Sequence, residues 1–393
     1  MEQKHLLYLA PTVDFGNQGA VGIRKKVIGQ CEAFGRLGYA TTLVMYENGN
    51  VVIRNPNGEF STYQYSKLLW AMGCCKSIIK KLVLKHNKKF DTLYIRKALA
   101  ETPFTLSAIK FLSKHSDKVI CEIPTYPYDE EMRGTYKRYD FKKKLQVFPF
   151  YLFGVFFSDK IFRNQLHKYV DCFAVITDLQ SCDTAFKAPA IKMSNGIDVR
   201  NMPLRDKTPD DTLSLIAVAG VSYWHGYDRV ISGMHEYYKH GGDKKIVFHI
   251  VGYGAAIGEL TQLAKDLDLE SQVIFHGVKT GAELDKLFGG ADLGVATFGG
   301  HRLDRDIDSD LKVCEYCARA LPYITSMRDT DIPDSFTWKL LMANEEAPID
   351  FNSVIAFHEK CLSNSENLIG MRDFAEENLS WDVHLKTVLD FPK

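Results

Sequence analysis

Two residues near the end of the chain have side chains and a spacing suited to binding a nucleotide. Lys312 and Glu315 stand three positions apart in the stretch DSDLKVCEYCARALPYITS. We predict that a polar loop leads here into a helix, whose first turn would carry both side chains on one face. Unpaired amides in that turn attract anions, which favours a phosphate beside Lys312, while Glu315 can accept hydrogen bonds from hydroxyls. The alternative is an ordinary exposed Lys–Glu pair.

The composition limits the class of protein. A chain of 393 residues exceeds what one core usually fills, so two domains are expected. A hydrophobic content of 46% and a charged content of 25% are typical of a soluble globular protein. Basic and acidic residues balance at 49 each, and the net charge therefore gives no reason to expect a nucleic-acid partner.

The nine cysteines are scattered and odd in number, which favours a reduced, cytoplasmic chain over a disulfide framework. Cys314 and Cys317 form a C-x-x-C pair, but they lie on a predicted helix and no second pair exists. We therefore favour a buried structural role over metal binding or redox chemistry. The N-terminal apolar run is too short for a signal peptide and predicts a first strand.

The first half of the chain alternates strand and helix patterns. Such alternation predicts a parallel sheet covered by helices on both faces. The expected strands are residues 5–10, 41–45, 91–98, 118–124, 169–176 and 191–197. One helix is expected to follow the first loop and end at Leu37, and two more are expected at residues 67–89 and 104–115.

Two loops of this half follow predicted strands. Residues 11–22 contain Gly16, Gly19 and Gly22, which allow a ligand to approach the backbone closely, although the spacing is not the dinucleotide fingerprint. A flexible loop is an equal alternative.

The second loop is rich in tyrosine and charge and follows the strand at residues 118–124. Open α/β sheets bind ligands at this end of their strands. Glu122, Tyr126 and Asp129 are therefore candidates for the acceptor side of a site, against the alternative of a solvated loop with packed tyrosines.

Residues 145–157 form the most apolar run of the chain and follow the basic segment KRYDFKKK. Thirteen residues are too few to span a bilayer as a helix. Basic and aromatic groups together favour contact with an anionic membrane surface, through Phe148, Phe150 and Phe153. A buried helix is the equal alternative.

Residues 198–212 contain two prolines, lack apolar periodicity and predict a linker. The strand–helix alternation then resumes, with strands at residues 213–220, 245–254, 272–278, 292–298 and 323–326. We expect domains at 1–200 and 201–371, with a C-terminal helix at about 372–393 that packs back on the first domain. A final helical pattern begins at residue 367.

Three loops of the second half would converge in a doubly wound sheet: SYWHGYDR, VGYG and the start of DLKVCEY. Their convergence is what a nucleotide pocket at a topological switch point requires. Glycine-turn amides, Lys312 and Arg229 are suited to a diphosphate. No P-loop motif is present. The residues expected at the donor are Gly220, His225, Gly226, Gly252, Tyr253, Gly254, Asp310 and Leu311.

These motifs in their order resemble the donor domain of GT-B-fold glycosyltransferases of family 4. The matching segments are IAVAGVSYWHGYDRVI, FHIVGYG, VIFHGV, ADLGVATF and DLKVCEYCARALPYITS, and NGID at 195–198 matches the interdomain position. The resemblance implies an α/β fold of two Rossmann-like, doubly wound parallel-sheet domains that face a central cleft. It also implies a retaining transfer from a nucleoside-diphosphate sugar, with no metal and no cofactor.

The resemblance assigns roles to single residues. Glu315 matches the second acid of the E-x7-E motif, which contacts the ribose. Lys312 matches the basic residue that contacts the phosphate. The first acid is replaced by Ile307, which leaves its flanking residues Asp306 and Asp308 as candidates for the sugar. A family histidine of the N-terminal domain has no counterpart, because EIPTYPYD occupies that loop.

The implied mechanism is front-face attack, in which the leaving phosphate deprotonates the acceptor hydroxyl. The aromatic run suggests a saccharide or lipid-linked saccharide acceptor at the inner face of the plasma membrane, in bacterial surface polysaccharide assembly. Two alternatives remain: a GT-B-like epimerase or phosphorylase, and a catalytically silent partner subunit that keeps the pocket.

Overall fold

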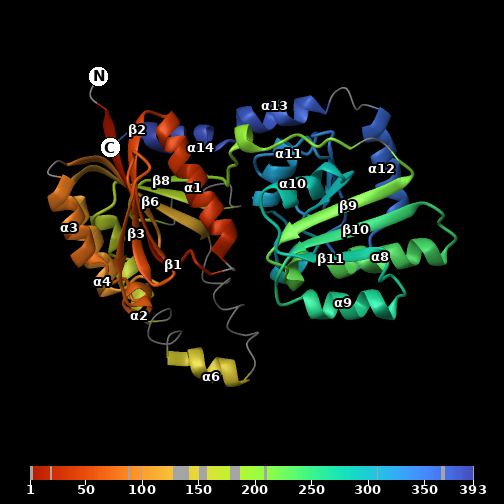
Figure 1. Cartoon of the computed structure of the whole chain (residues 1–393), viewed down its shortest axis with the longest axis horizontal. Coiled ribbons are helices and arrows are strands. Elements are labelled where there is room, and N and C mark those ends of the chain that lie inside the picture. The colour runs from red at the N-terminus through yellow and green to blue at the C-terminus, as the bar shows by residue number, and fades with distance from the viewer. Residues whose placement is uncertain are drawn as a thin grey trace. The chain divides into compact units, whose positions relative to one another are not determined.

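The computed structural model describes residues 3–17, 20–86, 89–98, 100–126, 141–149, 157–177, 186–207, 210–307, 309–363 and 368–392. The chain forms two compact units (Figure 1). Unit 1 comprises Met1–Ser194 and Trp381–Lys393, and unit 2 comprises Asn195–Ser380.

Unit 1 is built on an eight-stranded sheet with the order β4-β3-β2-β1-β5-β6-β7-β8. The strands from β2 to β8 in this order run parallel, whereas β3 and β4 form an antiparallel extension that we did not predict. The strands are β1 (Lys4–Asp14), β2 (Tyr39–Glu47), β3 (Asn50–Arg54), β4 (Phe60–Gln64), β5 (Phe90–Arg96), β6 (Ser116–Tyr126), β7 (Cys172–Thr177) and β8 (Ala190–Met193).

Helices cover both faces of this sheet. Successive side chains of a strand point to opposite faces, so a strand that is apolar throughout needs packing partners on both. In β1, Leu7 and Leu9 join the core that contains α3 (Lys76–His86) and α4 (Pro103–Ser113). Tyr8 between them contacts Phe34 of α1 (Val21–Arg36) on the other face. Two further helices of unit 1 are α6 (Phe141–Pro149) and α7 (Lys160–Arg163).

Three predicted boundaries, two in unit 1 and one between the units, are wrong. The expected helix at 67–89 is two helices, α2 (Lys67–Ala71) and α3, since Gly73 between them has φ +79° and lies against Thr105. The loop expected at 11–22 begins four residues later, at Phe15, because β1 continues to Asp14. The final helical pattern divides at Leu379 and Ser380 into α13 (Ile369–Asn378) and α14 (Trp381–Asp390).

The helix α14 belongs to unit 1, where it packs against α1. Its Trp381 is 2% exposed and lies on the α-carbon of Gly29, and Asp382 accepts hydrogen bonds from Arg36 at 2.5–2.9 Å. The ammonium group of Lys118 donates to the carbonyls of Leu389 and Phe391, at 2.7 and 2.5 Å. These contacts satisfy carbonyl groups that the end of a helix leaves unpaired.

Unit 2 contains a six-stranded parallel sheet with the order β11-β10-β9-β12-β13-β14. The winding direction reverses between β9 and β12, and sheets of this kind bind ligands at that point, beyond the carboxyl ends of the strands. The strands are β9 (Thr212–Ala219), β10 (Lys245–Gly252), β11 (Val273–Gly277), β12 (Leu293–Val295), β13 (Tyr323–Thr325) and β14 (Lys339–Leu341).

The helices of unit 2 also divide between the two faces of the sheet. One core contains β9 residues Leu213 and Leu215 with α8 (Tyr227–Lys239), α9 (Ile257–Asp266) and α12 (Phe351–Ser363). The other contains Ile216 with α10 (Ala282–Gly289), α11 (Leu311–Ala318) and α13. Each unit is therefore a doubly wound α/β domain, which confirms the predicted fold class.

Candidate functional site

The loops that follow β9 and β12 lie against each other at the switch point of the unit 2 sheet. The amide of Phe298 donates to the carbonyl of His225 at 2.8 Å, and the amide of Gly299 donates to that of Trp224 at 3.1 Å. Gly226 has φ +65°, and a β-carbon there would lie 2.5 Å from the carbonyl carbon of Phe298. Only glycine allows this approach of the two backbones.

The predicted glycine turn after β10 joins the same edge. Gly252 has φ +129°, and a β-carbon at this position would lie 1.9 Å from the carbonyl oxygen of Ala219. A β-carbon on Gly254 would lie 2.0 Å from the carbonyl oxygen of Val221, whose amide donates to Tyr253 at 3.1 Å. The Tyr253 side chain is 70% exposed. The turn therefore packs directly beside Gly220 and presents one aromatic ring to solvent.

The helix α11 begins at this edge with a polar cluster around Lys312. Asp310 is the N-cap residue and accepts from the Lys312 amide at 3.2 Å and from the Thr297 hydroxyl at 2.9 Å. The Lys312 ammonium group donates to Asp310 at 2.5 Å and to Thr297 at 3.1 Å. Leu311 is the first residue of the helix. The cluster fixes the position of the ammonium group at the first turn, as the sequence predicted.

Both residues of the Lys–Glu pair are buried, so the alternative of an exposed surface pair is wrong. Lys312 is 9% exposed and Glu315 is 8% exposed. The Glu315 carboxylate accepts from the Arg319 guanidinium at 3.0 and 3.2 Å, and Arg319 also donates to Asp285 at 2.6 Å. A hydroxyl bound by Glu315 would therefore share the carboxylate with the guanidinium of Arg319.

His225 lies beside this cluster and is uncharged at neutral pH. Burial and the positive charge of Lys312 lower the pKa of His225 to about 3. Its Nδ1 accepts from the Ser222 amide at 3.0 Å, so the proton of the neutral ring resides on Nε2. Burial alone would raise the pKa of Asp310, but the charge and hydrogen bond of Lys312 outweigh burial and lower it. The cluster thus combines a fixed carboxylate, a fixed ammonium group and a neutral imidazole donor.

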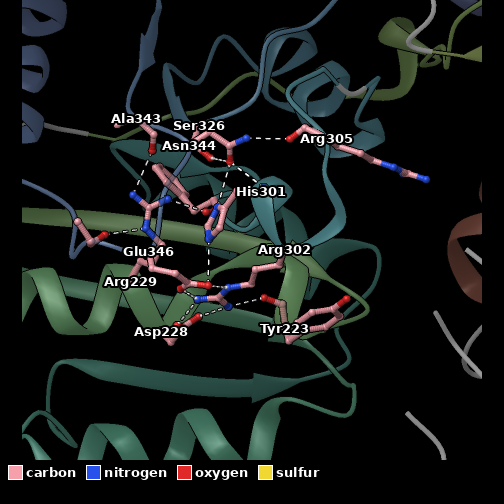
Figure 2. A network of polar contacts seen from close by, with 12 residues as sticks. Tyr223, Asp228, Arg229, His301, Arg302, Arg305, Ser326, Ala343, Asn344 and Glu346 are labelled. Carbon is pink, nitrogen blue, oxygen red and sulfur yellow. Dashed lines mark hydrogen bonds and ion pairs between the residues drawn. The ribbon is translucent and has the colours of Figure 1, made fainter. Parts of the chain in front are cut away.

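The prediction that Arg229 binds phosphate is wrong. Its guanidinium donates to three backbone carbonyls, those of Phe298, Ala343 and Ala347, at 2.6, 3.1 and 2.7 Å (Figure 2). The residue is 4% exposed. Arg229 thus joins the β12 loop to the segment after β14, a role that depends on residues 69 to 118 positions away.

A second network of polar contacts involves the β12 loop through Arg302 and Arg305. Arg302 donates to the carboxylates of Asp228 and Glu346, and Asn344 donates to the carbonyl of Arg305 at 2.8 Å (Figure 2). Asn344 also donates to the carboxylate of Asp306 at 2.8 Å. The carboxylate of Asp306, one candidate for the missing acid, is therefore engaged. Asp308, the other candidate, lies outside the described residues.

Sequence reasoning missed Thr297, Arg302 and Asn344. Thr297 could have been found as the hydroxyl two residues beyond the end of the apolar strand β12. The two others carry no motif, because their partners are brought together only by the fold.

Among the acceptor-side candidates of unit 1, Glu122 is wholly inaccessible. Its carboxylate pairs with Lys26 at 2.9 Å and Arg96 at 2.8 Å, and it accepts from Gln30 and Tyr94 at 2.7 and 2.8 Å. Its exposed fraction is 0%. The carboxylate cannot meet an acceptor in this arrangement, because α1 covers it.

The remaining candidates of unit 1 differ in position. Gly16 lies against Asn48: a β-carbon on Gly16 would be 2.0 Å from the side-chain oxygen of Asn48, and the Gly16 amide donates to Asp14 at 3.1 Å. Tyr126 ends β6 and packs on Phe186, with 5.3 Å between ring centroids. Gly19 and Asp129 lie outside the described residues.

The described part of the run 145–157 does not form a buried helix. In α6, Leu145 is 68% and Phe148 is 46% exposed, and Phe157 beyond it is 63% exposed. Phe150 and Phe153 lie outside the described residues. No described helix is both long and apolar enough to cross a membrane.

Cys314 and Cys317 are buried free thiols on α11, in agreement with a structural role. Within the described parts of the chain, no group of three or more His, Cys, Asp and Glu side chains is arranged to hold a metal ion.

Comparison with known proteins identifies the fold. Neither a family model nor the sequence of a curated protein matches the chain. Among solved structures, sucrose-phosphate synthase from Thermosynechococcus elongatus superposes with a TM-score of 0.64 at 13% identity, over 98% of each chain. HepE from Anabaena, solved with UDP and glucose, gives 0.54 at 13% identity over 98% of each chain. The pneumococcal O-GlcNAc transferase GtfA, solved with UDP and GlcNAc, gives 0.56 at 10% identity over 99% of this chain and 98% of its own.

These neighbours define the class of fold to which the chain belongs. It has the GT-B fold of glycosyltransferases, with a doubly wound α/β domain in each unit.

Proposed function

We propose that the chain is a glycosyltransferase that takes a sugar from a nucleoside-diphosphate sugar. The observation that carries this proposal is the cluster of Lys312, Asp310, Thr297 and His225 at the switch point, bordered by the glycine turns after β9 and β10. HepE and GtfA, which share the fold, were solved with UDP, and this supports a nucleotide sugar as the donor here.

The chemistry of the leaving group fits the cluster. Transfer breaks the bond between the sugar's anomeric carbon and a diphosphate oxygen, and the negative charge that develops there must be stabilised. Asp310 and Thr297 hold the Lys312 ammonium group before the donor arrives, so little reorganisation is needed. The Nε2–H of His225 supplies a neutral donor beside it.

We further propose the finer features that the family 4 resemblance implies. Transfer retains the anomeric configuration by front-face attack, in which the departing phosphate oxygen accepts the proton of the acceptor hydroxyl, and neither a metal nor a cofactor takes part. Glu315 contacts the ribose together with Arg319. Isolation of a covalent glycosyl-enzyme intermediate on any aspartate or glutamate would contradict this route.

The acceptor in this proposal is a saccharide or a lipid-linked saccharide in surface polysaccharide assembly. The enzyme is then cytoplasmic and peripheral at the inner face of the plasma membrane. The exposed side chains of Leu145 and Phe148 on α6 support contact of the segment 145–157 with the membrane.

A panel of nucleotide sugars, assayed for hydrolysis and for protection against thermal unfolding, tests the central assignment. We expect Lys312→Ala and Glu315→Gln each to weaken nucleotide binding at least about tenfold, or about 1.4 kcal/mol. The matched controls are Lys265→Ala and Glu259→Gln on the exposed face of α9, which should bind as the wild type does. Wild-type affinity in both site variants would refute the nucleotide site.

A second candidate function is a GT-B-like protein that binds a nucleotide without transferring sugar. Ile307 at the register of the first acid, and Asp306 engaged by Asn344, favour this alternative. Tight nucleotide binding with no turnover of any nucleotide sugar, with saccharide acceptors present, would support a silent partner. Interconversion of a sugar without an acceptor would support an epimerase.

A further inference from the structure

Residues 60–90 carry an unusual local charge. This segment contains no Asp, Glu or Arg, although acidic and basic residues balance over the whole chain. Its only charged residues apart from His86 are seven lysines: Lys67, Lys76, Lys80, Lys81, Lys85, Lys88 and Lys89. Lysine without arginine differs from protein–protein interfaces, which are depleted in lysine and enriched in arginine.

The lysines of α2 and α3 lie on the solvent-exposed side of these helices in unit 1. On α3, Lys76, Lys80 and Leu84 follow each other at helical spacing and are exposed, while Ile79 and Val83 face the core. Lys81 and Lys85 are also exposed. The side chain of Lys67 at the start of α2 is 70% exposed and forms an ion pair with Asp14 at 2.8 Å. Figure 1 shows α3 and α4 on the same side of the unit 1 sheet.

The helix α2 adds apolar side chains to this lysine face. Leu68, Leu69 and Met72 are 69%, 43% and 40% exposed. The helix cannot turn them inward, because Trp70 anchors it: this side chain is 2% exposed, stacks on Tyr46 and donates to the carbonyl of Val13.

The apolar surface continues onto the start of α4. The Thr102 hydroxyl donates to the carbonyl of Met72 at 2.8 Å, and Lys76 donates to Ser107 at 2.9 Å. Phe104, at the start of α4 beside this junction, is 45% exposed. We call the set formed by α2, the outer face of α3 and Phe104 the lysine–leucine surface.

We propose that the lysine–leucine surface binds an anionic lipid membrane. Lysine ammonium groups on long apolar stems suit phosphate headgroups, and the leucine, methionine and phenylalanine side chains suit the boundary between headgroups and acyl chains. The surface is distinct in sequence from the segment 145–157. The inference adds a second contact to the membrane association in the proposed function, and it does not require that the donor assignment be correct.

Vesicle sedimentation of the full chain tests this surface. We expect the wild type to partition onto vesicles of phosphatidylcholine with about 30% phosphatidylglycerol, and to partition at least about tenfold less onto phosphatidylcholine alone, because each lysine gains from an anionic surface. The partition should fall with added salt as the charges are screened.

Two variants separate the charged and apolar contributions. Lys80→Glu with Lys81→Glu should lower the partition at least about tenfold, and Leu68→Ser with Leu69→Ser and Met72→Ser should lower it by a similar factor. Lys265→Glu with Lys286→Glu, an equal charge change on exposed helix positions of unit 2, should leave it unchanged. Leu145→Ser with Phe148→Ser reports the α6 contact separately.

The proposal fails if the wild type does not prefer anionic vesicles, or if the control lowers partition as much as the Lys80 and Lys81 change. Loss with the lysine variant but none with the serine variant would show a purely electrostatic contact and would refute insertion of the apolar side chains of this surface. Unchanged melting temperatures and unchanged nucleotide-sugar hydrolysis in detergent-free buffer show that a variant is folded. They also separate failure of this surface from failure of the transferase assignment.

Discussion

Both units bury charged side chains at the carboxyl ends of their strands, but the two clusters are organised differently. In unit 1, Glu122 is fully enclosed and makes four close contacts, two of them ion pairs, to Lys26 and Arg96. In unit 2, Lys312 lies at the start of a helix and contacts Asp310 and Thr297, at a sheet edge whose backbone turns need glycine.

The difference indicates which cluster serves stability and which serves a ligand. A buried carboxylate with a complete set of partners belongs to the core, and removing it leaves two cations without compensation. An ammonium group at a helix N-terminus, whose partners among the described residues are Asp310 and Thr297, can exchange part of its contact with Asp310 for a phosphate oxygen. Position at a strand end alone therefore does not identify a binding residue.

The largest effect is expected from Glu122→Gln, which tests whether the unit 1 cluster is a core element. The change should destabilise unit 1 by about 3–5 kcal/mol, because Lys26 and Arg96 stay buried without an opposite charge. Urea unfolding followed by Trp70 and Trp381 fluorescence, with Trp224 and Trp338 replaced by Phe, reports this unit alone. If stability falls by less than about 1 kcal/mol while sugar transfer is lost, Glu122 belongs to the acceptor site after all.

A smaller effect is expected from Gly252→Ala in the unit 2 turn. A β-carbon there meets the Ala219 carbonyl at 1.9 Å with φ at +129°, so strain should cost about 2 kcal/mol or more and displace the turn. Both the melting temperature and nucleotide affinity should fall. Gly258→Ala on α9, where nothing lies within 4 Å, is the control and should be neutral or slightly stabilising. Normal affinity in Gly252→Ala would remove this turn from the site.

The smallest effect is expected in the pH dependence of stability, which should differ between the His225 cluster and the Glu122 cluster. The folded-state pKa of His225 is about 3, below the ordinary 6.5, so the unfolded chain binds the extra proton first and stability falls as pH decreases from 6.5 towards 3. The loss should be about 2 kcal/mol between about pH 7 and 5, and His225→Gln should abolish it.

Glu122 behaves differently because Lys26 and Arg96, working against burial, lower its pKa to about 2. Its contribution to stability is complete above pH 4.5 and is lost as pH falls towards 2. Nucleotide binding should be constant between about pH 6 and 8, since His225 stays neutral; a binding midpoint near pH 6.5 would show that the ring is charged.

The sequence predicted the parallel strands of both sheets except β14, because buried parallel strands are nearly continuous apolar runs between turn residues, as in LSLIAVAG and KIVFHIVG. It also placed Lys312 at the start of α11, since Asp310 is a favourable N-cap. The β3–β4 extension was missed because its strands are short and β4 is mostly exposed.

The errors concern residues whose partners are distant in sequence. Arg229 was predicted to bind phosphate, but three carbonyls at positions 298, 343 and 347 take its guanidinium. Glu122 was predicted to lie on the acceptor side of a site, but Lys26 and Arg96 enclose it. No local pattern encodes these contacts.

The chain order of the two units affects how the protein folds during synthesis. Unit 2 is one continuous segment, Asn195–Ser380, whose ends are joined by a bridge between Ile197 and Ser380. Unit 1 is interrupted by it and needs α14, whose Trp381, Leu385 and Val388 are at most 2% exposed. Domains fold as units as they leave the ribosome. Unit 2 can therefore complete its core before unit 1, although the N-terminal segment of unit 1 is translated first. Until α14 has been synthesised, the face of the unit 1 core that α14 covers stays exposed.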